Sequence, residues 1–129
     1  MQASPQTFTK SERLCSKKAI AELFENGRSF YSSTFQVIWI RSENEMKYPA
    51  QVAISVSKKG FKLATDRNLI RRRIREAWRK NKHLLYEFLA GKNIRIVLIV
   101  IFKGNIIPDY SVIEKSVAGL IGKLISDIP

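Results

Sequence analysis

The segment that most constrains the fold is an apolar, β-branched run in the C-terminal third of the chain, N-I-R-I-V-L-I-V-I-F at residues 93–102. Successive side chains of a strand point to opposite faces of its sheet, and here both sets are largely apolar. A strand of this kind is typical of the centre of a sheet that is covered on both faces. We therefore expect this segment to form a central strand.

Two further strands are predicted upstream. Residues 35–41 read F-Q-V-I-W-I-R, with apolar side chains on both faces, and residues 51–57 read Q-V-A-I-S-V-S, in which Val and Ile alternate with small side chains. Alternating aromatic and β-branched residues are typical of strands. The polar run 42–49 is expected to join the two strands as a β-hairpin with a long loop. An extra short strand is expected near Phe30.

Three helices complete the predicted order, α-β-β-α-β-α. Apolar residues at helical spacing predict a short helix at about 16–26 and a third helix at 110–125. Between them, a long helix is expected at about 66–90, with Thr65 or Asp66 as its N-cap. This pattern predicts an α+β fold, in which a small sheet packs against helices.

The chain has the length and composition of a single domain. It contains 129 residues, 45% of them hydrophobic, which is enough for a sizeable core. We expect residues 1–129 to form one domain. Residues 1–13 are polar and without periodicity, and they are expected to form a flexible N-terminal arm.

Arginine is concentrated between Arg67 and Arg79, where six of thirteen residues are Arg and only Glu76 is acidic. On a helix at about 100° per residue, the apolar residues of this segment fall on one side. The adjacent side carries Asn68, Arg71, Arg72, Arg75, Arg79 and Lys82. Like charges one turn apart repel each other, whereas a guanidinium forks readily onto phosphate oxygens. The segment therefore favours an anionic partner rich in phosphate.

The net charge is concentrated in the same part of the chain. The whole sequence has 23 basic and 11 acidic residues, a net charge of +12, and residues 58–82 alone hold eleven basic and two acidic residues. Such a local field indicates a polyanionic partner rather than general solubility.

Other function classes find little support in the sequence. The chain has one Cys and one His, too few for the usual zinc sites or for a Cys–His or Ser–His nucleophile pair with a spare member. Its carboxylates do not cluster as in a two-metal nuclease. No apolar stretch reaches eighteen residues, and the N-terminus M-Q-A-S-P-Q-T is unlike a signal peptide. We expect a cytoplasmic protein that does not bind membranes.

Several motifs taken together resemble the bacterial ribonuclease P protein family. The basic signature begins R-N-L-I-R-R at Arg67, with Leu69 at the third position of the motif known as RNR. It is accompanied by F-T-K-S-E-R-L at 8–14, I-x-x-L-F-x-x-G-x-S-F at 20–30 and S-V-S-K-K at 55–59. Each piece alone is weak, but the combination is specific.

The resemblance implies the protein subunit of a ribonucleoprotein endoribonuclease that removes the 5′ leader from precursor tRNA. The catalyst in that family is the RNA, so no catalytic residue is expected in the protein. The implied partners are ribonuclease P RNA and precursor tRNA, with Mg²⁺ held mainly by RNA and no obligatory protein partner. The implied fold is similar to the second domain of ribosomal protein S5, a mainly antiparallel sheet packed with three helices and containing a left-handed β-α-β crossover.

The resemblance also implies two sets of site residues. The expected RNA-binding residues are Lys58, Lys59, Lys62, Arg67, Asn68, Arg71, Arg72, Arg75 and Arg79. The resemblance itself implies this role for Arg67, Asn68, Arg71, Arg72 and Arg75. Of these, Asn68 is expected to lie near an RNA-bound Mg²⁺. A groove between the first helix and the sheet is expected to bind the leader, and its lining residues are Ile20, Phe24, Phe35 and Ile38.

Two other functions share some of these features. A ribosomal or other structural RNA-binding protein without a processing role would carry the same charge. A DNA-binding regulator is less well supported, because a helix face that is nearly all Arg reads phosphate rather than sequence.

Overall fold

The computed structural model describes residues 8–129. A short 3-10 turn, η1 (Lys10–Glu12), comes first. The other elements, in chain order, are α1 (Lys17–Asn26), β1 (Arg28–Ser32), β2 (Phe35–Arg41), β3 (Ala50–Val56), α2 (Ala64–Lys92), β4 (Ile96–Phe102) and α3 (Tyr110–Asp127). The predicted α+β fold, the order of elements and the extra strand near Phe30 are confirmed. No helix in this described part of the chain is long and apolar enough to span a membrane.

Strand β4 lies in the interior of the sheet, as its apolar run predicts. The four strands have the order β1-β2-β4-β3. β4 pairs antiparallel with β2 and parallel with β3, so that Val100 is opposite both Val37 and Ile54. The sheet is therefore mixed, with two antiparallel pairs and one parallel pair.

The predicted hairpin between β2 and β3 is wrong, because β4 is inserted between these two strands. Both faces of β4 are apolar, and its burial is greatest when other strands flank it on both sides. The hairpin of this fold is formed by β1 and β2, which are joined by Ser33 and Thr34. Ser33 adopts a left-handed conformation with φ 55°, which a tight turn requires.

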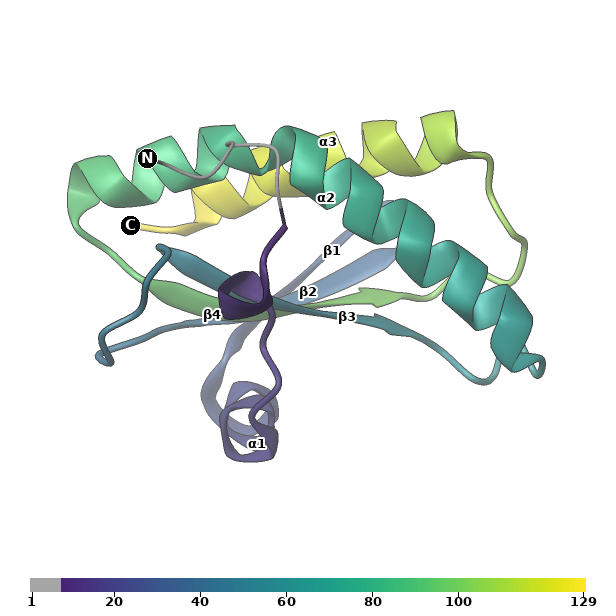
Figure 1. The fold of residues 1–129 in the computed structure, drawn as a ribbon, viewed down its shortest axis with the longest axis horizontal. Helices are drawn as coiled ribbons and strands as arrows, with labels where there is room; N and C mark the ends of the chain where they lie inside the picture. Colours follow the sequence, from purple (N-terminus) through teal and green to yellow (C-terminus); the bar gives the residue numbers. More distant parts are fainter. Residues whose placement is uncertain (1–7) are drawn as a thin grey trace.

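The parallel strands β3 and β4 are connected by α2. Figure 1 shows both strands running to the right with α2 above them, and β1 and β2 are fainter because they are more distant. Since β3 is at the edge opposite β1, β3 is nearer to the viewer than β4. The β-α-β crossover is therefore left-handed, as the family resemblance implies, and departs from the usual right-handed rule.

The helices cover the two faces of the sheet unequally. Helices α2 and α3 lie over one face, and the short α1 lies on the other (Figure 1). The larger core lies beneath α2 and α3 and includes Trp78, Phe102 and Leu98. The smaller core includes Leu23 and Ile38. Because α1 is short, side chains on its face of the sheet, such as Ile40 and Ile101, stay partly exposed.

The observed ends of α1 agree with the predicted range of about 16–26. The Ser16 hydroxyl accepts a hydrogen bond from the Ala19 N–H at 3.2 Å, which caps the first turn. Gly27 follows the last residue of the helix, and a Cβ there would lie 2.5 Å from the Leu23 carbonyl oxygen and 2.7 Å from a methyl of Ile38. Glycine at this position lets α1 approach β2 closely.

The ends of α2 differ from the prediction. The N-cap is Leu63, which makes no side-chain capping hydrogen bond, and the predicted caps Thr65 and Asp66 lie in the first turn. At the other end the helix passes Gly91 and is ended by Asn93 in a left-handed conformation. Asn tolerates that conformation because its side chain can bond locally. The helix therefore gains a little length at both ends.

The expected N-terminal arm falls partly outside the described residues, which begin at Phe8. Thr9 and Glu12 form a capping box around η1. The Leu14 N–H then donates to the Val52 carbonyl at 3.0 Å, and Arg13 forms a β-bridge with Val52. This part of the arm lies along the free edge of β3.

Candidate nucleic-acid interface

The basic face lies on the N-terminal half of α2. The opposite side of this helix buries Ile70, Ile74 and Trp78 in the larger core, so its arginines are turned outward. Arg72 and Arg75 are exposed. Within residues 8–129, neither of their guanidinium groups has a hydrogen-bond acceptor. These two groups are available to an external anion.

Other arginines of α2 are bonded within the protein. Arg67 donates to the carbonyls of Phe61 at 2.7 Å and Lys62 at 3.1 Å, and it fixes the loop that leads into the helix. Arg73 donates to the Pro108 carbonyl at 2.7 Å and fixes the approach to α3. These arginines have a structural task, which the sequence pattern does not reveal.

Asn68 and Arg71 form a pair on the first turns of α2. The Arg71 Nη1 donates to the Asn68 Oδ1 at 2.6 Å. A cationic group so close to the amide oxygen is unfavourable for a divalent cation at the same atom. Among residues 8–129, no three His, Cys, Asp or Glu side chains are grouped as metal ligands. The side chains around Asn68 therefore do not fit direct coordination of Mg²⁺ by the protein.

Arg75 lies within the positive field of neighbouring arginines. Burial first, and then the charges of Arg13 and Arg71, lower the pKa of Arg75 from its ordinary value. An arginine pKa is so high that the side chain stays protonated all the same. Arg13, which belongs to the N-terminal arm, thus lies near the basic face. Arg13 was not predicted as a site residue, because proximity across the fold has no signal in the local sequence pattern.

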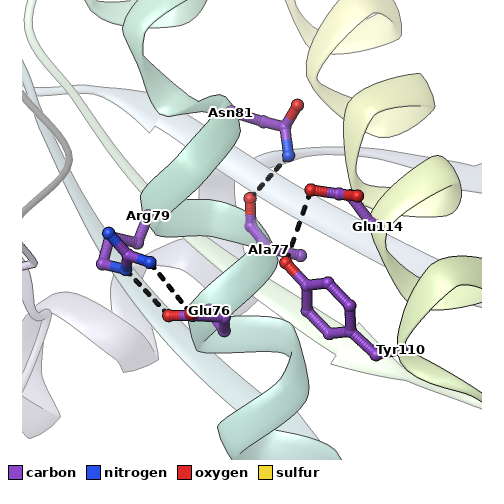
Figure 2. A network of polar contacts seen from close by, with 6 residues as sticks. All are labelled: Glu76, Ala77, Arg79, Asn81, Tyr110 and Glu114. Carbon is purple, nitrogen blue, oxygen red and sulfur yellow. Dashed lines mark hydrogen bonds and ion pairs between the residues drawn. The ribbon is translucent and has the colours of Figure 1, made fainter.

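A hollow of about 460 Å³ lies on the outer side of α2 toward the start of α3. Its lining residues are Arg72, Arg73, Arg75, Glu76, Arg79 and Tyr110. Figure 2 shows Glu76 bonded to Arg79 and, beside this pair, Tyr110 directed at Glu114. The hydrogen bond from Arg79 lowers the pKa of Glu76. Burial, together with the carboxylates of Glu114 and Glu76, raises the pKa of Tyr110.

Lys82 does not belong to the basic face, contrary to the helical projection. Its side chain is buried and forms an ion pair with the buried carboxylate of Glu12. The Tyr86 hydroxyl donates to the same carboxylate at 2.6 Å. The projection was wrong because the N-terminal arm covers this position, and a contact across 70 residues of sequence leaves no trace in local periodicity.

The three predicted loop lysines lie between β3 and α2. Lys58, Lys59 and Lys62 are exposed and follow β3 directly, next to the first turn of α2. A Cβ on Gly60 would lie only 2.6 Å from the Gly104 carbonyl oxygen, so glycine allows this loop to pack against the loop after β4. The loop lysines continue the basic face beyond the end of the helix.

A second surface lies on the sheet face beside α1. Phe24 is 59% exposed, Ile20 is half-buried and Ile38 lies beneath it in the smaller core. Tyr31 is 61% exposed and is opposite Gln36 in the sheet, so both side chains are on the face of Ile38. Tyr31 is not among the predicted groove residues. Its place next to the predicted short strand was the only available signal.

Phe35 does not line this surface, so its assignment to the groove was wrong. Its ring is 1% exposed and packs edge-on against Phe102, with the ring centroids 5.5 Å apart, in the larger core. Phe35 and Ile38 are three positions apart in one strand, and side chains at odd spacing point to opposite faces. Of the four predicted groove residues, Ile20, Phe24 and Ile38 share one side of the sheet.

An exposed arginine face on a small α+β domain is typical of a nucleic-acid-binding protein. The family model described as Ribonuclease P matches residues 8–124. The chain therefore belongs to the ribonuclease P protein family, and the resemblance found in the sequence is confirmed. Its role is that of a protein subunit of this tRNA-processing endoribonuclease.

Individual relatives agree with this assignment. The ribonuclease P protein component of Porphyromonas gingivalis strain W83 is 32% identical over 129 residues, which covers 98% of this chain and 93% of that protein. The protein component of Petrotoga mobilis is 38% identical over 122 residues, covering 92% and 96%.

The fold is also similar to solved structures. The Staphylococcus aureus RNase P protein gives a TM-score of 0.66 at 24% identity and covers 89% of this chain and 95% of that chain. The Thermotoga maritima RNase P protein gives a TM-score of 0.66 at 24% identity, covering 87% and 96%.

Proposed function

We propose that the basic face of α2 binds the RNA subunit of ribonuclease P. The observation that carries this proposal is that Arg72 and Arg75 are exposed and lack an acceptor in the described part of the chain. Arg71 lies in the same field. Contacts of this kind neutralise phosphates and position a protein on RNA without reading its sequence. The exposed loop lysines extend the same surface.

The sheet face beside α1 is proposed to bind the single-stranded 5′ leader of precursor tRNA. Phe24 and Tyr31 expose aromatic side chains there, and Ile38 provides an apolar floor. Stacking of an unpaired base on an aromatic ring contributes about 1–3 kcal/mol. A surface of this kind binds the extended leader and does not contact the folded body of the tRNA.

The cleavage chemistry is proposed to belong to the RNA. Bound Mg²⁺ would neutralise charge and activate the attacking water, and we assign its ligands to RNA because the Asn68 oxygen already accepts a bond from Arg71. The protein's own contribution is to hold the RNA subunit through α2 and the leader through the sheet face.

A precursor-tRNA cleavage assay with bacterial ribonuclease P RNA tests this function. Adding the protein at moderate salt should raise the rate of 5′ leader removal, and protein purified free of RNA should cleave nothing. Binding to precursor tRNA by the assembled enzyme should exceed binding to mature tRNA. Unchanged cleavage by the RNA when protein is added, or cleavage by protein alone, would contradict the proposal.

A further inference from the structure

A buried polar cluster joins the N-terminal arm to α2. The Glu12 carboxylate is fully buried. It accepts hydrogen bonds from the Lys82 ammonium, from the Tyr86 hydroxyl at 2.6 Å and from the Thr9 N–H at 2.9 Å. The Glu12 carboxylate thus accepts bonds both from Thr9, in its own turn, and from Lys82 of α2, 70 positions later in the sequence.

This cluster is better suited to fixing a position than to adding stability. Burying two opposite charges costs solvation that their attraction only partly returns, so apolar residues would stabilise the same site at least as well. What the pair does supply is a unique place for the arm, because a buried charge without its partner is strongly unfavourable. The residue placed most directly is the next one along the chain, Arg13.

Arg13 is brought to the basic face of α2 by this arrangement. Its guanidinium carbon lies 5.6 Å from the centre of the Phe8 ring, and the Lys82 ammonium lies 5.9 Å from the centre of the same ring. The β-bridge between Arg13 and Val52 fixes the backbone. The Arg13 side chain is nevertheless exposed, and its charge reaches Arg75.

Two like charges held close to each other repel, so the arm would not bring Arg13 toward Arg75 without the buried cluster to hold it. A phosphate between or beside the two guanidinium groups would relieve that repulsion. We infer that Arg13 is a further RNA-binding residue of the basic face, and that Glu12 is its positioning residue. The inference rests on the proposed function of α2.

The test measures the affinity of the full chain for ribonuclease P RNA over a range of salt concentrations. Arg13→Ala should weaken binding about threefold to tenfold and reduce the slope of log affinity against log salt by about 0.7 to 0.9, one phosphate contact. Arg41→Ala is the matched control, because Arg41 is also an exposed arginine. It is the last residue of β2 and pairs with Ile96, at the end of the sheet opposite the loop lysines. It should have little effect on either quantity.

Double variants distinguish a role of Glu12 in positioning Arg13 from a general role in the stability of the fold. In the Glu12→Gln background, Arg13→Ala should add almost no further loss, because the arm no longer holds Arg13 in place. In the same background, Arg75→Ala should lower the RNA affinity as much as it does in the natural protein, because α2 holds Arg75 in place without the arm. Hydrogen exchange at the Leu14 amide, which bonds to Val52, should be faster in Glu12→Gln. If Glu12→Gln does not fold, Tyr86→Phe replaces it as the milder variant.

The outcomes are distinguishable. If the unaltered protein does not bind the RNA, the proposed function itself is wrong. If it binds and Arg75→Ala weakens binding while Arg13→Ala behaves like Arg41→Ala, the proposed function stands and the role of Arg13 is refuted. Equal losses from Arg13→Ala with and without Glu12→Gln would leave Arg13 as a contact and refute the positioning role of Glu12.

Discussion

Glu76 accepts two hydrogen bonds from Arg79, one from Nε at 2.7 Å and one from Nη2 at 2.8 Å (Figure 2). The protein thereby neutralises part of its own basic face, within a hollow that is otherwise lined by arginines and a tyrosine. An RNA phosphate that approaches Arg79 must compete with this carboxylate. The pair is partly exposed, so solvent weakens it and a phosphate can displace the carboxylate from Arg79.

Glu76→Gln is expected to strengthen binding to ribonuclease P RNA. The change removes a negative charge from the basic face and weakens the ion pair with Arg79, and we expect a gain of about threefold at low salt that fades as salt screens the charges. The free energy of unfolding should hardly change, because exposed pairs contribute little. Glu87→Gln is the control, since Glu87 is exposed farther along α2. A loss of affinity in Glu76→Gln would show that the carboxylate helps RNA binding.

Arg75→Ala is expected to lower RNA affinity and to reduce the salt slope by about 0.7 to 0.9. The side chain is exposed, and it is separate from the apolar stripe of α2, so stability should change by less than about 0.5 kcal/mol. Arg41→Ala is again the matched control. Arg73 would be a poor one, because its bond to Pro108 contributes to the fold. Equal slopes for Arg75→Ala and Arg41→Ala would mean that overall charge, not this face, holds the RNA.

Phe24→Ala is expected to reduce the preference of the assembled enzyme for precursor over mature tRNA. Phe24 is largely exposed, so its loss removes a leader contact at little cost in stability. Phe35→Ala is the contrasting variant, since this ring is buried and its truncation should destabilise the protein by about 3–5 kcal/mol. Binding of both tRNAs, with thermal unfolding of each variant, provides the measurement. A Phe24→Ala enzyme with unaltered preference would argue against leader binding at α1.

The Glu12 cluster predicts a defined pH dependence of stability. Burial alone would raise the pKa of Glu12, but the bonds from Lys82, Thr9 and Tyr86 outweigh it and lower the pKa overall. A lowered pKa in the folded state means that the carboxylate stabilises the protein above its unfolded pKa of about 4.3, and that this contribution is lost as pH falls through the folded value.

Urea unfolding of the natural protein and of Glu12→Gln between pH 3 and pH 7 tests this dependence. Near neutral pH the variant should be less stable by about 1–3 kcal/mol. Below the unfolded pKa the difference should shrink toward zero, because the natural carboxyl then also becomes neutral. A difference that stays constant down to the most acidic point would show that Glu12 stabilises through its shape rather than its charge.

Much of the fold could be predicted because it follows from local periodicity. The apolar run at 96–102 could bury both of its faces only in the interior of a covered sheet, and β4 does lie there. Ser16 and Gly27 mark the ends of α1 by the chemistry of capping and close approach. The hairpin prediction failed because the alternation in β2 and β3 fixes which face each side chain takes, but not which strand lies alongside.

The sequence by itself determined that α2 is basic on one side and apolar on the other, because helical geometry alone assigns residues to sides. Only the tertiary structure decided what each charged residue does. Arg67 and Arg73 bond to carbonyls of neighbouring loops, Lys82 is buried against Glu12, and Arg72 and Arg75 are left outward. The physical reason is that burial and pairing depend on which distant segments cover a helix, and those contacts have no period in the sequence.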